Sequence, residues 1–229
     1  MTLLVLKIIA LVSMTVDHIG RFFFPESVWM TTVGRIAFPI FAWGVANGYR
    51  ESKDISKYGI RLGAVGIISQ IPYALAFIQI GRSPYELNIL FTLLLGLCAI
   101  IAYDRIQEKY IRNIVLVILI CLGTVCNVSY GWYGVTIVLL FHTTFQNIPK
   151  RVLLFTIATI GYVFFYSFFA TIQNNGEIVY RGLQQLCSLA ALIPISLYHG
   201  ISGRRLKYVF YIYYPLHLSI IAVLYYLIK

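Results

Sequence analysis

Charged side chains are scarce in this sequence. Of its 229 residues, 11% are charged and 60% hydrophobic, whereas soluble domains usually have about 25% charged residues. Among the charged residues the acidic ones are the rarer, with 8 Asp and Glu against 18 Lys and Arg. The scarcity of charge and the mean hydropathy of +0.82 exclude a soluble domain and indicate an integral membrane protein.

Cysteine motifs and phosphate loops are also missing. The cysteines lie inside apolar segments, without the CxxC or Cys/His spacing of a zinc site, so the sequence predicts neither a disulfide framework nor a bound metal. There is no Gly-rich phosphate loop, no solenoid-type repeat and no low-complexity region. The first apolar segment is too long for a cleavable signal peptide, and no small-x-small cleavage site follows it.

Long apolar runs recur along the whole chain. A transmembrane helix needs roughly 20 apolar residues. The runs fall near residues 3–23, 30–49, 59–80, 87–103, 111–128, 131–146, 152–172, 178–199 and 207–228. We therefore predict an all-α, polytopic transmembrane bundle of about nine helices, forming a single domain over residues 1–229. The fourth to sixth runs are short, and the sixth is compatible with a partly re-entrant segment.

Basic residues alternate between the predicted connections. The connections after even-numbered runs hold Arg50, Lys53, Lys57, Arg61, Arg105, Lys109, Arg112, Lys150, Arg151, Arg204, Arg205 and Lys207. The other connections hold Arg21, Arg82 and Arg181. The positive-inside rule therefore predicts a multi-pass protein of the cytoplasmic membrane with its amino terminus inside and its carboxyl terminus outside. This placement explains the net charge of +10 without a nucleic-acid partner.

Asp17 and His18 stand side by side in the first apolar run. An ionisable residue costs about 2.5–3.5 kcal/mol at the centre of a bilayer and less near its surface, so an adjacent pair is a candidate for chemistry. Ser13, Gly20 and Arg21 recur with Asp17 at spacings of three and four, which places them on one helix face. His18 lies about 100° round the helix from Asp17, so a direct contact between the two is not assured.

Other polar residues are predicted to lie in the same outer half of the membrane. Arg35 is at the outer end of the second run, which contains Pro39, and Asn88 and Thr92 are one turn apart at the start of the fourth. The last run carries Tyr213, Tyr214, Pro215 and His217 near its middle. We expect Asp17, Arg35, Asn88 and His217 to face one interior cavity, because polar groups exposed to lipid are costly.

Several strings match, in order, the motifs of one family. They are LKIIALVSMTVDHIG (6–20), GRIAFPIFA (34–42), SQIPY (69–73), LNILFTLLLG (87–96), YGWYGV (130–135) and FYIYYPLHL (210–218). Together they resemble the TraX family, known for acetylating the amino terminus of F-type conjugative pilin. The chain departs from the family at two positions, with Ser129 where an acidic residue is expected and His199 where Asn is usual.

The resemblance implies a membrane-embedded acetyltransferase that moves an acetyl group from acetyl-CoA to an amine or hydroxyl. The acceptor is membrane-embedded or on the outer side, for example the amino terminus of a pilin-like peptide. His18 is the candidate general base, because its pKa suits proton removal from the acceptor, and Asp17 is its neighbour. A purely structural role, in which both residues bond to neighbouring helices, is the alternative.

The remaining candidates have two interpretations each. Arg35 has a functional interpretation, in which it neutralises Asp17, binds the acceptor or stabilises the oxyanion. Its structural interpretation is an arginine at the membrane interface. Asn88 and Thr92 are candidates to donate to the thioester carbonyl, although interhelical hydrogen bonds are the commoner use of such residues. His217 and Tyr214 either bind substrate or belong to the core.

Basic residues near the last connection, Arg204, Arg205 and Lys207, are candidates to hold the phosphates of coenzyme A. Membrane topology alone also explains their charge. Two other functions remain open on the sequence: a proton-coupled small-solute transporter, which uses buried ionisable residues and broken helices, and a non-catalytic assembly factor.

Overall fold

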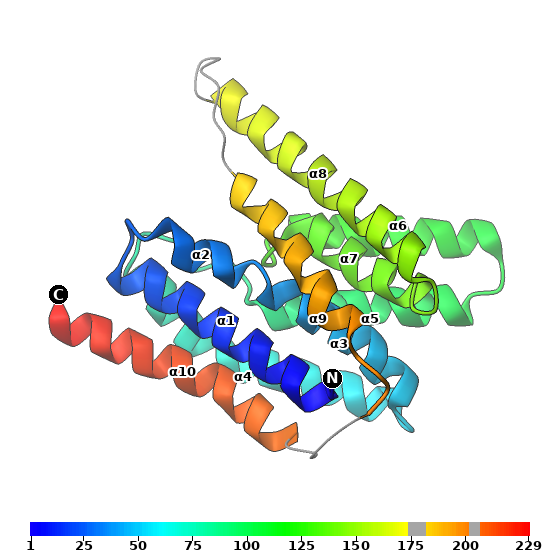
Figure 1. The fold of residues 1–229 in the computed structure, drawn as a ribbon, viewed down its shortest axis with the longest axis horizontal. Coiled ribbons are helices and arrows are strands. Elements are labelled where there is room, and N and C mark those ends of the chain that lie inside the picture. Colours follow the sequence, from blue (N-terminus) through cyan, green and yellow to red (C-terminus); the bar gives the residue numbers. More distant parts are fainter. Residues whose placement is uncertain (174–181, 202–206) are drawn as a thin grey trace. The chain divides into compact units, whose positions relative to one another are not determined.

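The structure, a computed structural model, describes residues 1–173, 182–201 and 207–229. Within these ranges the chain is helical and has no strand, apart from one isolated bridge between Leu87 and Val128. The elements are α1 (Leu3–Phe23), α2 (Val28–Gly34), α3 (Ala37–Glu51), α4 (Ile55–Ile78), α5 (Ile89–Arg105), α6 (Lys109–Val125), α7 (Gly131–Thr143), α8 (Ile148–Gln173), η1 (Leu183–Ala191), α9 (Leu192–Ser196) and α10 (Lys207–Ile228). The prediction of an all-α protein is confirmed (Figure 1).

The described helices include five that are long and apolar enough to cross a membrane. They cover Leu3–Phe23, Val28–Glu51, Ile55–Ile78, Ile148–Ala170 and Val209–Ile228, which confirms a multi-pass membrane protein. With α2 and α3 taken as one interrupted span, and η1 with α9 as another, the described elements form the nine predicted helical stretches. The side of the membrane on which the amino terminus lies stays a prediction.

The fourth to sixth stretches are short, as predicted. Helices α5 and α6 have 17 residues each and α7 has 13. At 1.5 Å per residue, α7 is about 20 Å long, whereas the hydrocarbon core of a bilayer is about 30 Å thick. Helix α7 is therefore too short to cross an undeformed bilayer by itself.

The chain divides into two compact units. The first unit consists of Met1–Phe41 and Thr144–Gly203, and the second of Ala42–Thr143 and Arg204–Lys229. In the first unit α1 packs against α2, α2 against η1, and η1 against α8 and α9 (Figure 1). Leu6, Ala10 and Phe155 are among its fully buried side chains.

The predicted second helix is interrupted between α2 and α3. Our sequence expectation of a single helix with Pro39 inside it was wrong, because α2 ends at Gly34 and α3 begins at Ala37. A proline in a helix cannot donate to the carbonyl four residues earlier, and its ring clashes with that carbonyl, which here belongs to Arg35. Pro39 is instead in the first turn of α3, where proline is tolerated. The break leaves Arg35 at the junction of the two helices.

The predicted eighth helix also differs from expectation. The described part of residues 178–199 begins with the nine-residue 3₁₀ helix η1, and only Leu192–Ser196 is α-helical. Pro194 lies in α9 and has no amide hydrogen to donate to the carbonyl of Ala190 in η1, so one helical hydrogen bond is missing where η1 meets α9. Side chains three residues apart on η1 therefore lie in line with each other.

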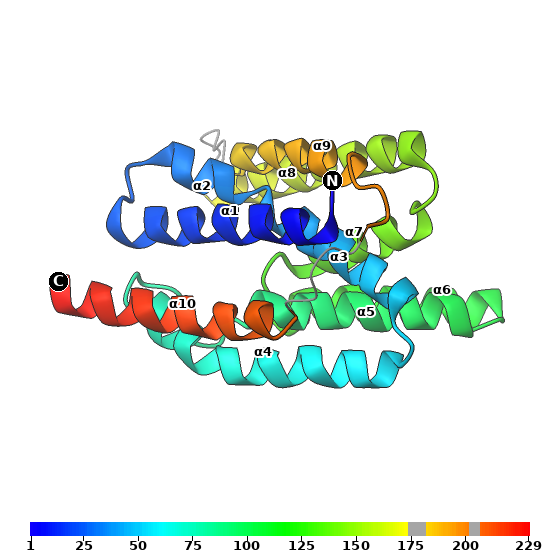
Figure 2. The same cartoon turned by 60° about the horizontal axis from the view of Figure 1, so that its bottom comes forward.

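In the second unit, α5 packs against α4, α6 and α7, and α10 packs against α4 (Figure 2). The contact between α5 and α7 is close because Gly96 lies against Val138: a Cβ atom on Gly96 would be 2.5 Å from the Val138 Cβ. Tyr133, Val135 and Phe141 of α7 are fully buried in this unit. Helix α10 continues through Pro215 without interruption.

Candidate functional site

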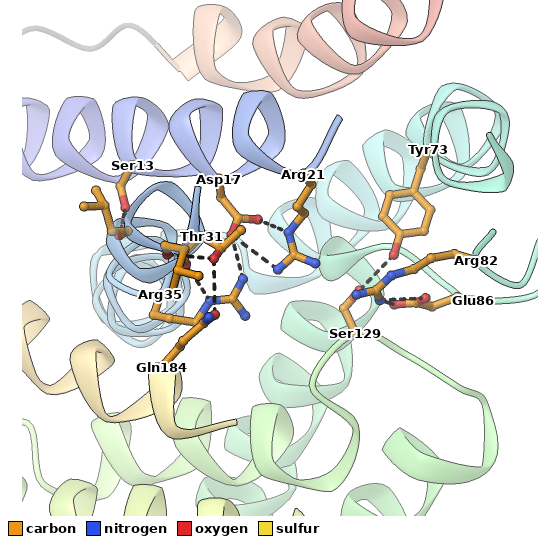
Figure 3. Close-up of polar contacts among 12 residues, drawn as sticks. Ser13, Asp17, Arg21, Thr31, Arg35, Tyr73, Arg82, Glu86, Ser129 and Gln184 are labelled. Carbon is orange, nitrogen blue, oxygen red and sulfur yellow. Dashed lines mark hydrogen bonds and ion pairs between the residues drawn. The ribbon is translucent and has the colours of Figure 1, made fainter. Parts of the chain in front are cut away.

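The carboxylate of Asp17 accepts hydrogen bonds from two arginines. Arg21 Nε lies 2.6 Å from Oδ2 and Arg21 Nη2 lies 3.3 Å from Oδ1. Arg35 Nη2 lies 2.6 Å from Oδ1 (Figure 3). Asp17 is buried, with 8% of its surface exposed, and Arg21 and Arg35 are partly buried; the three residues are called the Asp17 cluster below.

Local structure brings each member of the Asp17 cluster into place. Arg21 is one helical turn after Asp17 on α1, the spacing at which helical side chains meet. Arg35 is presented by the break between α2 and α3, and its Nε donates to the carbonyl of Thr31 at 3.0 Å. Gly34 lies directly against the Asp17 side chain, where any added Cβ would collide with the carboxylate. The close approach of α1 and the end of α2 therefore requires glycine at this position.

The polar face of α1 forms as predicted. Ser13 and Asp17 are buried, and the hydroxyl of Ser13 donates to the carbonyl of Val33 at 2.6 Å. Next to this contact, the hydroxyl of Thr31 lies 3.2 Å from Oε1 of Gln184 on η1 (Figure 3). Helices α1 and α2 and the 3₁₀ helix η1 are thus joined by polar contacts around the Asp17 cluster.

The Asp17 cluster contains two guanidinium groups and one carboxylate, so it has an excess positive charge. Where water is excluded, such a charge interacts strongly with any anion or developing negative charge nearby. The ion pairs also hold the two guanidinium groups in fixed positions, which lowers the cost of reorganisation when a negative charge forms. The cluster can therefore stabilise an oxyanion, or bind an anionic substrate group.

His18 is buried beside this cluster, with 8% of its surface exposed, and it interacts electrostatically with Asp17. Both oxygens of Asp17 accept from arginines, so the carboxylate is engaged by Arg21 and Arg35. His18 and the Asp17 cluster thus belong to the same unit, and His18 is next to Asp17 on α1.

Asn88 and Thr92 organise the start of α5 in the second unit. Asn88 is the N-cap of this helix: Oδ1 accepts from the Leu90 amide at 3.0 Å. Its side-chain amide donates to the Gly66 carbonyl at 2.8 Å and to Gln70 Oε1 at 2.9 Å. The hydroxyl of Thr92 donates to the carbonyl of Ser129 at 2.5 Å. Both residues therefore make contacts between neighbouring segments, the alternative raised by the sequence.

Tyr214 and His217 lie together on α10. The His217 ring is stacked on Tyr213, with ring centroids 5.1 Å apart, and its Nδ1 lies 2.9 Å from the Tyr213 carbonyl. The Tyr214 ring is 5.5 Å from the His217 ring, and its hydroxyl contacts the backbone amide of Ile89. The middle of α10, which carries these residues, is thereby joined to the start of α5.

The four residues that were expected to line one cavity belong to two different units. Asp17 and Arg35 belong to the first unit and contact each other, whereas Asn88 and His217 belong to the second. A single cavity lined by all four stays a prediction. Arg204 and Arg205, the candidates for coenzyme A binding, lie outside the described residues, and Lys207 is the first residue of α10.

Sequence reasoning did not predict three contacts that the structure shows for the candidates, those with Arg21, Gln70 and Ser129. The spacing of four residues between Asp17 and Arg21 was a sufficient signal for their ion pair. Gln70 and Ser129, the partners of Asn88 and Thr92, are remote in sequence and gave no local signal. Among the described residues, no group of three or more His, Cys, Asp or Glu side chains gathers in a way that would hold a metal ion.

Comparisons with known proteins give one consistent family. The model of the family described as TraX protein matches residues 2–225. A probable fimbrial assembly protein, FimC of serogroup H1 from Dichelobacter nodosus, is 25% identical over 232 aligned positions, which cover 95% of this chain and 93% of that protein. A TraX protein of Escherichia coli is 33% identical over 132 positions, covering 57% of this chain and 51% of its own length. No solved structure matches the chain.

Proposed function

Because this chain belongs to the TraX family of multi-pass membrane proteins, we propose that it is an acetyltransferase that uses acetyl-CoA. The acceptor in this proposal is an amine or hydroxyl within the membrane or at its outer surface. The observation that supports the proposal best is the Asp17 cluster beside His18, where a possible base and fixed positive charge lie in one buried region.

In the proposed reaction the acceptor nitrogen or oxygen attacks the carbonyl carbon of the acetyl thioester. His18 takes the proton that the acceptor loses as the new bond forms. The carbonyl oxygen becomes negative in the tetrahedral intermediate, and the guanidinium groups of Arg21 and Arg35 stabilise it. The carbon–sulfur bond then breaks, and the leaving thiolate of coenzyme A takes the proton from His18, which restores the neutral imidazole.

Asp17 is a positioning residue in this scheme. Its carboxylate fixes the two guanidinium groups by short, charge-assisted hydrogen bonds. Asn88 and Thr92 hold the start of α5, and Tyr214 contacts the same helix start. In the proposal, these residues have a structural role within the second unit.

The acceptor class is suggested by the relatives. One is named for fimbrial assembly and two others are TraX proteins. We propose that this chain acetylates the amino terminus of a pilin-like membrane peptide, whose apolar segment lies in the bilayer while its terminus enters the site. An amino terminus is a nucleophile once deprotonated, which requires the base that His18 provides.

The test is mass spectrometry of pilin-like peptides from membranes of cells that express the chain, compared with cells that do not. The expected result is a gain of one acetyl group at the peptide amino terminus. A chain in which His18 is replaced by Ala, present in the membrane at the same level, should not produce this gain. Unchanged peptide masses, together with fimbrial assembly that fails only in the strain without the chain, would contradict an enzyme and favour an assembly factor.

A further inference from the structure

Arg151, in the first turn of α8, is a buried cation. Only 5% of its surface is exposed, and its Nη2 donates to the carbonyl of Phe145 at 3.2 Å. Within the described part of the chain, Arg151 forms no ion pair and its buried Nε has no hydrogen-bond partner. A guanidinium has five hydrogen-bond donors and stays charged, so burying it without a counter-charge is costly. Its position is best explained by an anion that is not part of the protein chain.

The neighbourhood of Arg151 increases the attraction for an anion. Lys150, the preceding residue, is exposed and positively charged. Both residues are in the first turn of a 26-residue helix, the end at which the helix dipole is positive. Asn147 fixes this turn, because its Oδ1 accepts from the Lys150 amide and its carbonyl from the Arg151 amide, each at 2.9 Å.

The first-turn amides of Lys150 and Arg151 are already used by Asn147. The donors left for a ligand are therefore those of the Arg151 guanidinium and the Lys150 ammonium group. A planar guanidinium matches the oxygen atoms of a phosphate, and a second cation alongside favours a phosphate with one or two negative charges. A phosphate group is therefore the anion that fits these residues best.

We propose that Arg151 and Lys150 form a binding site for a phosphate group. The predicted topology puts the connection between α7 and α8 on the cytoplasmic side, where acetyl-CoA is found. On the proposed function, on which this assignment rests, the ligand is coenzyme A, and the site holds one of its phosphates. The headgroup of an anionic phospholipid offers the same chemistry and is the other source of such a group.

The two sources are separated by measuring binding in nanodiscs of phosphatidylcholine, a zwitterionic lipid whose net charge is zero. Coenzyme A is added to the full chain, and its dissociation constant and the shift in Tm are measured. The substitution Arg151→Met removes the charge while keeping an unbranched apolar side chain, and Arg151→Lys keeps the charge but removes the planar fork. The matched control is Arg61→Met, which removes an exposed charge from α4. A second set of nanodiscs contains phosphatidylglycerol and no coenzyme A.

The expected result is that Arg151→Met weakens coenzyme A binding by roughly 10-fold or more, the usual effect of losing charge-assisted hydrogen bonds. Arg151→Lys should weaken it less, and Arg61→Met should leave it unchanged. Without ligand, Arg151→Met should have a Tm equal to or above that of the unchanged protein, because it removes an uncompensated buried charge. A lower Tm for this variant with unchanged coenzyme A affinity would make Arg151 a structural residue and overturn the site.

The remaining outcomes distinguish between coenzyme A, a lipid headgroup and no ligand at this site. Coenzyme A binding that is equally strong in all variants would overturn this site but leave the proposed acetyltransferase standing. A third outcome is that coenzyme A does not bind the unchanged protein, while phosphatidylglycerol raises the Tm of the unchanged protein but not the Tm of Arg151→Met. The phosphate site then stands with a lipid as its ligand, and acetyl-CoA fails as the proposed donor. If neither ligand distinguishes the unchanged protein from Arg151→Met, the site is refuted. Should Arg151→Met fail to fold, Arg151→Lys provides the same comparison with the charge retained.

Discussion

Arg35 Nη2 lies 2.6 Å from Asp17 Oδ1, although the two residues are 18 positions apart and on different helices. The contact depends on the break between α2 and α3, which leaves Arg35 at the junction, four residues before Pro39. It depends equally on Gly34, whose missing side chain makes room for the carboxylate. Replacing a residue that has no chemical role, such as Gly34, can thus decide whether the charged groups of Asp17 and Arg35 meet.

Replacing Asp17 should destabilise the protein. Asp17→Asn leaves the guanidinium groups of Arg21 and Arg35 without their shared carboxylate, and breaking a buried ion pair costs about 3–5 kcal/mol. Because 21% and 15% of the two arginine side chains remain exposed, the loss should be near or below the lower end of this range. Thermal unfolding in detergent measures it.

The single variants Arg21→Gln and Arg35→Gln serve as controls, because each leaves Asp17 with one arginine. Each should lower the Tm less than Asp17→Asn does. Equal unfolding temperatures for Asp17→Asn and the unchanged protein would show that the ion pairs do not contribute to stability.

The position of Gly34 can be tested separately from charge. Gly34→Ala places a methyl group where the Asp17 carboxylate lies, so α1 and α2 must move apart or the carboxylate must rotate away from Arg35. We expect a lower Tm and a loss of acetyl transfer of at least 10-fold, since small displacements of catalytic groups have large effects.

Gly44→Ala is the matched control, because a Cβ atom at this position in α3 would have no other atom within 4 Å. Alanine is favoured over glycine inside a helix by roughly 0.5–1 kcal/mol, so this variant should be as stable as the unchanged protein or more so. If Gly34→Ala and Gly44→Ala behave alike, the close packing of Gly34 on Asp17 is incorrect.

His18 is the residue that separates an enzyme from a scaffold. On the proposed function, His18→Ala should lower acetyl transfer by about 10²–10⁴-fold, the usual contribution of a general base, with little change in coenzyme A affinity. His18→Gln can keep a structural hydrogen bond but cannot take the proton. Quantitative mass spectrometry of the acetylated acceptor measures both, and near-normal transfer by His18→Gln would remove His18 from the mechanism and leave His217 as the next candidate.

The predicted topology has a direct test. A reporter enzyme that is active only outside the cytoplasm, fused after Lys229, should be active, because the positive-inside rule with nine crossings places this end outside. The same reporter fused in the basic connection after Glu51 should be inactive. If only the fusion after Glu51 is active, the orientation is the reverse of the predicted one. If both fusions are inactive, one of the short stretches between residues 109 and 143 does not cross the membrane.

The helical stretches and the polar face of α1 were predictable because both follow from local patterns. An apolar run of sufficient length has few alternatives in a bilayer, and Ser13 and Asp17 are one turn apart on the same helix. The interruption at Arg35 was not predictable in the same way, because the apolar run continues through it and Pro39 is compatible both with a helix interior and with the first turn of a new helix.

The environment of Asn88 shows the limit of sequence reasoning. Nothing near Asn88 in the sequence indicates that its amide hydrogens bind Gly66 and Gln70, more than a dozen residues earlier. Such contacts depend on how α4 and α5 pack, and this packing is determined by side chains along both helices. Residue types alone therefore identified a polar position without revealing its role.

The shortness of α7 has a consequence for the surrounding lipid. A helix about 10 Å shorter than the hydrocarbon thickness creates a hydrophobic mismatch, which is relieved by local thinning of the bilayer or by water entering next to the helix ends. Next to the ends of α7, the two aqueous phases would then lie closer together than beside the longer helices α4 and α10. A group that has to pass from a cytosolic carrier to an acceptor at the other surface would have a shorter apolar distance to cross there.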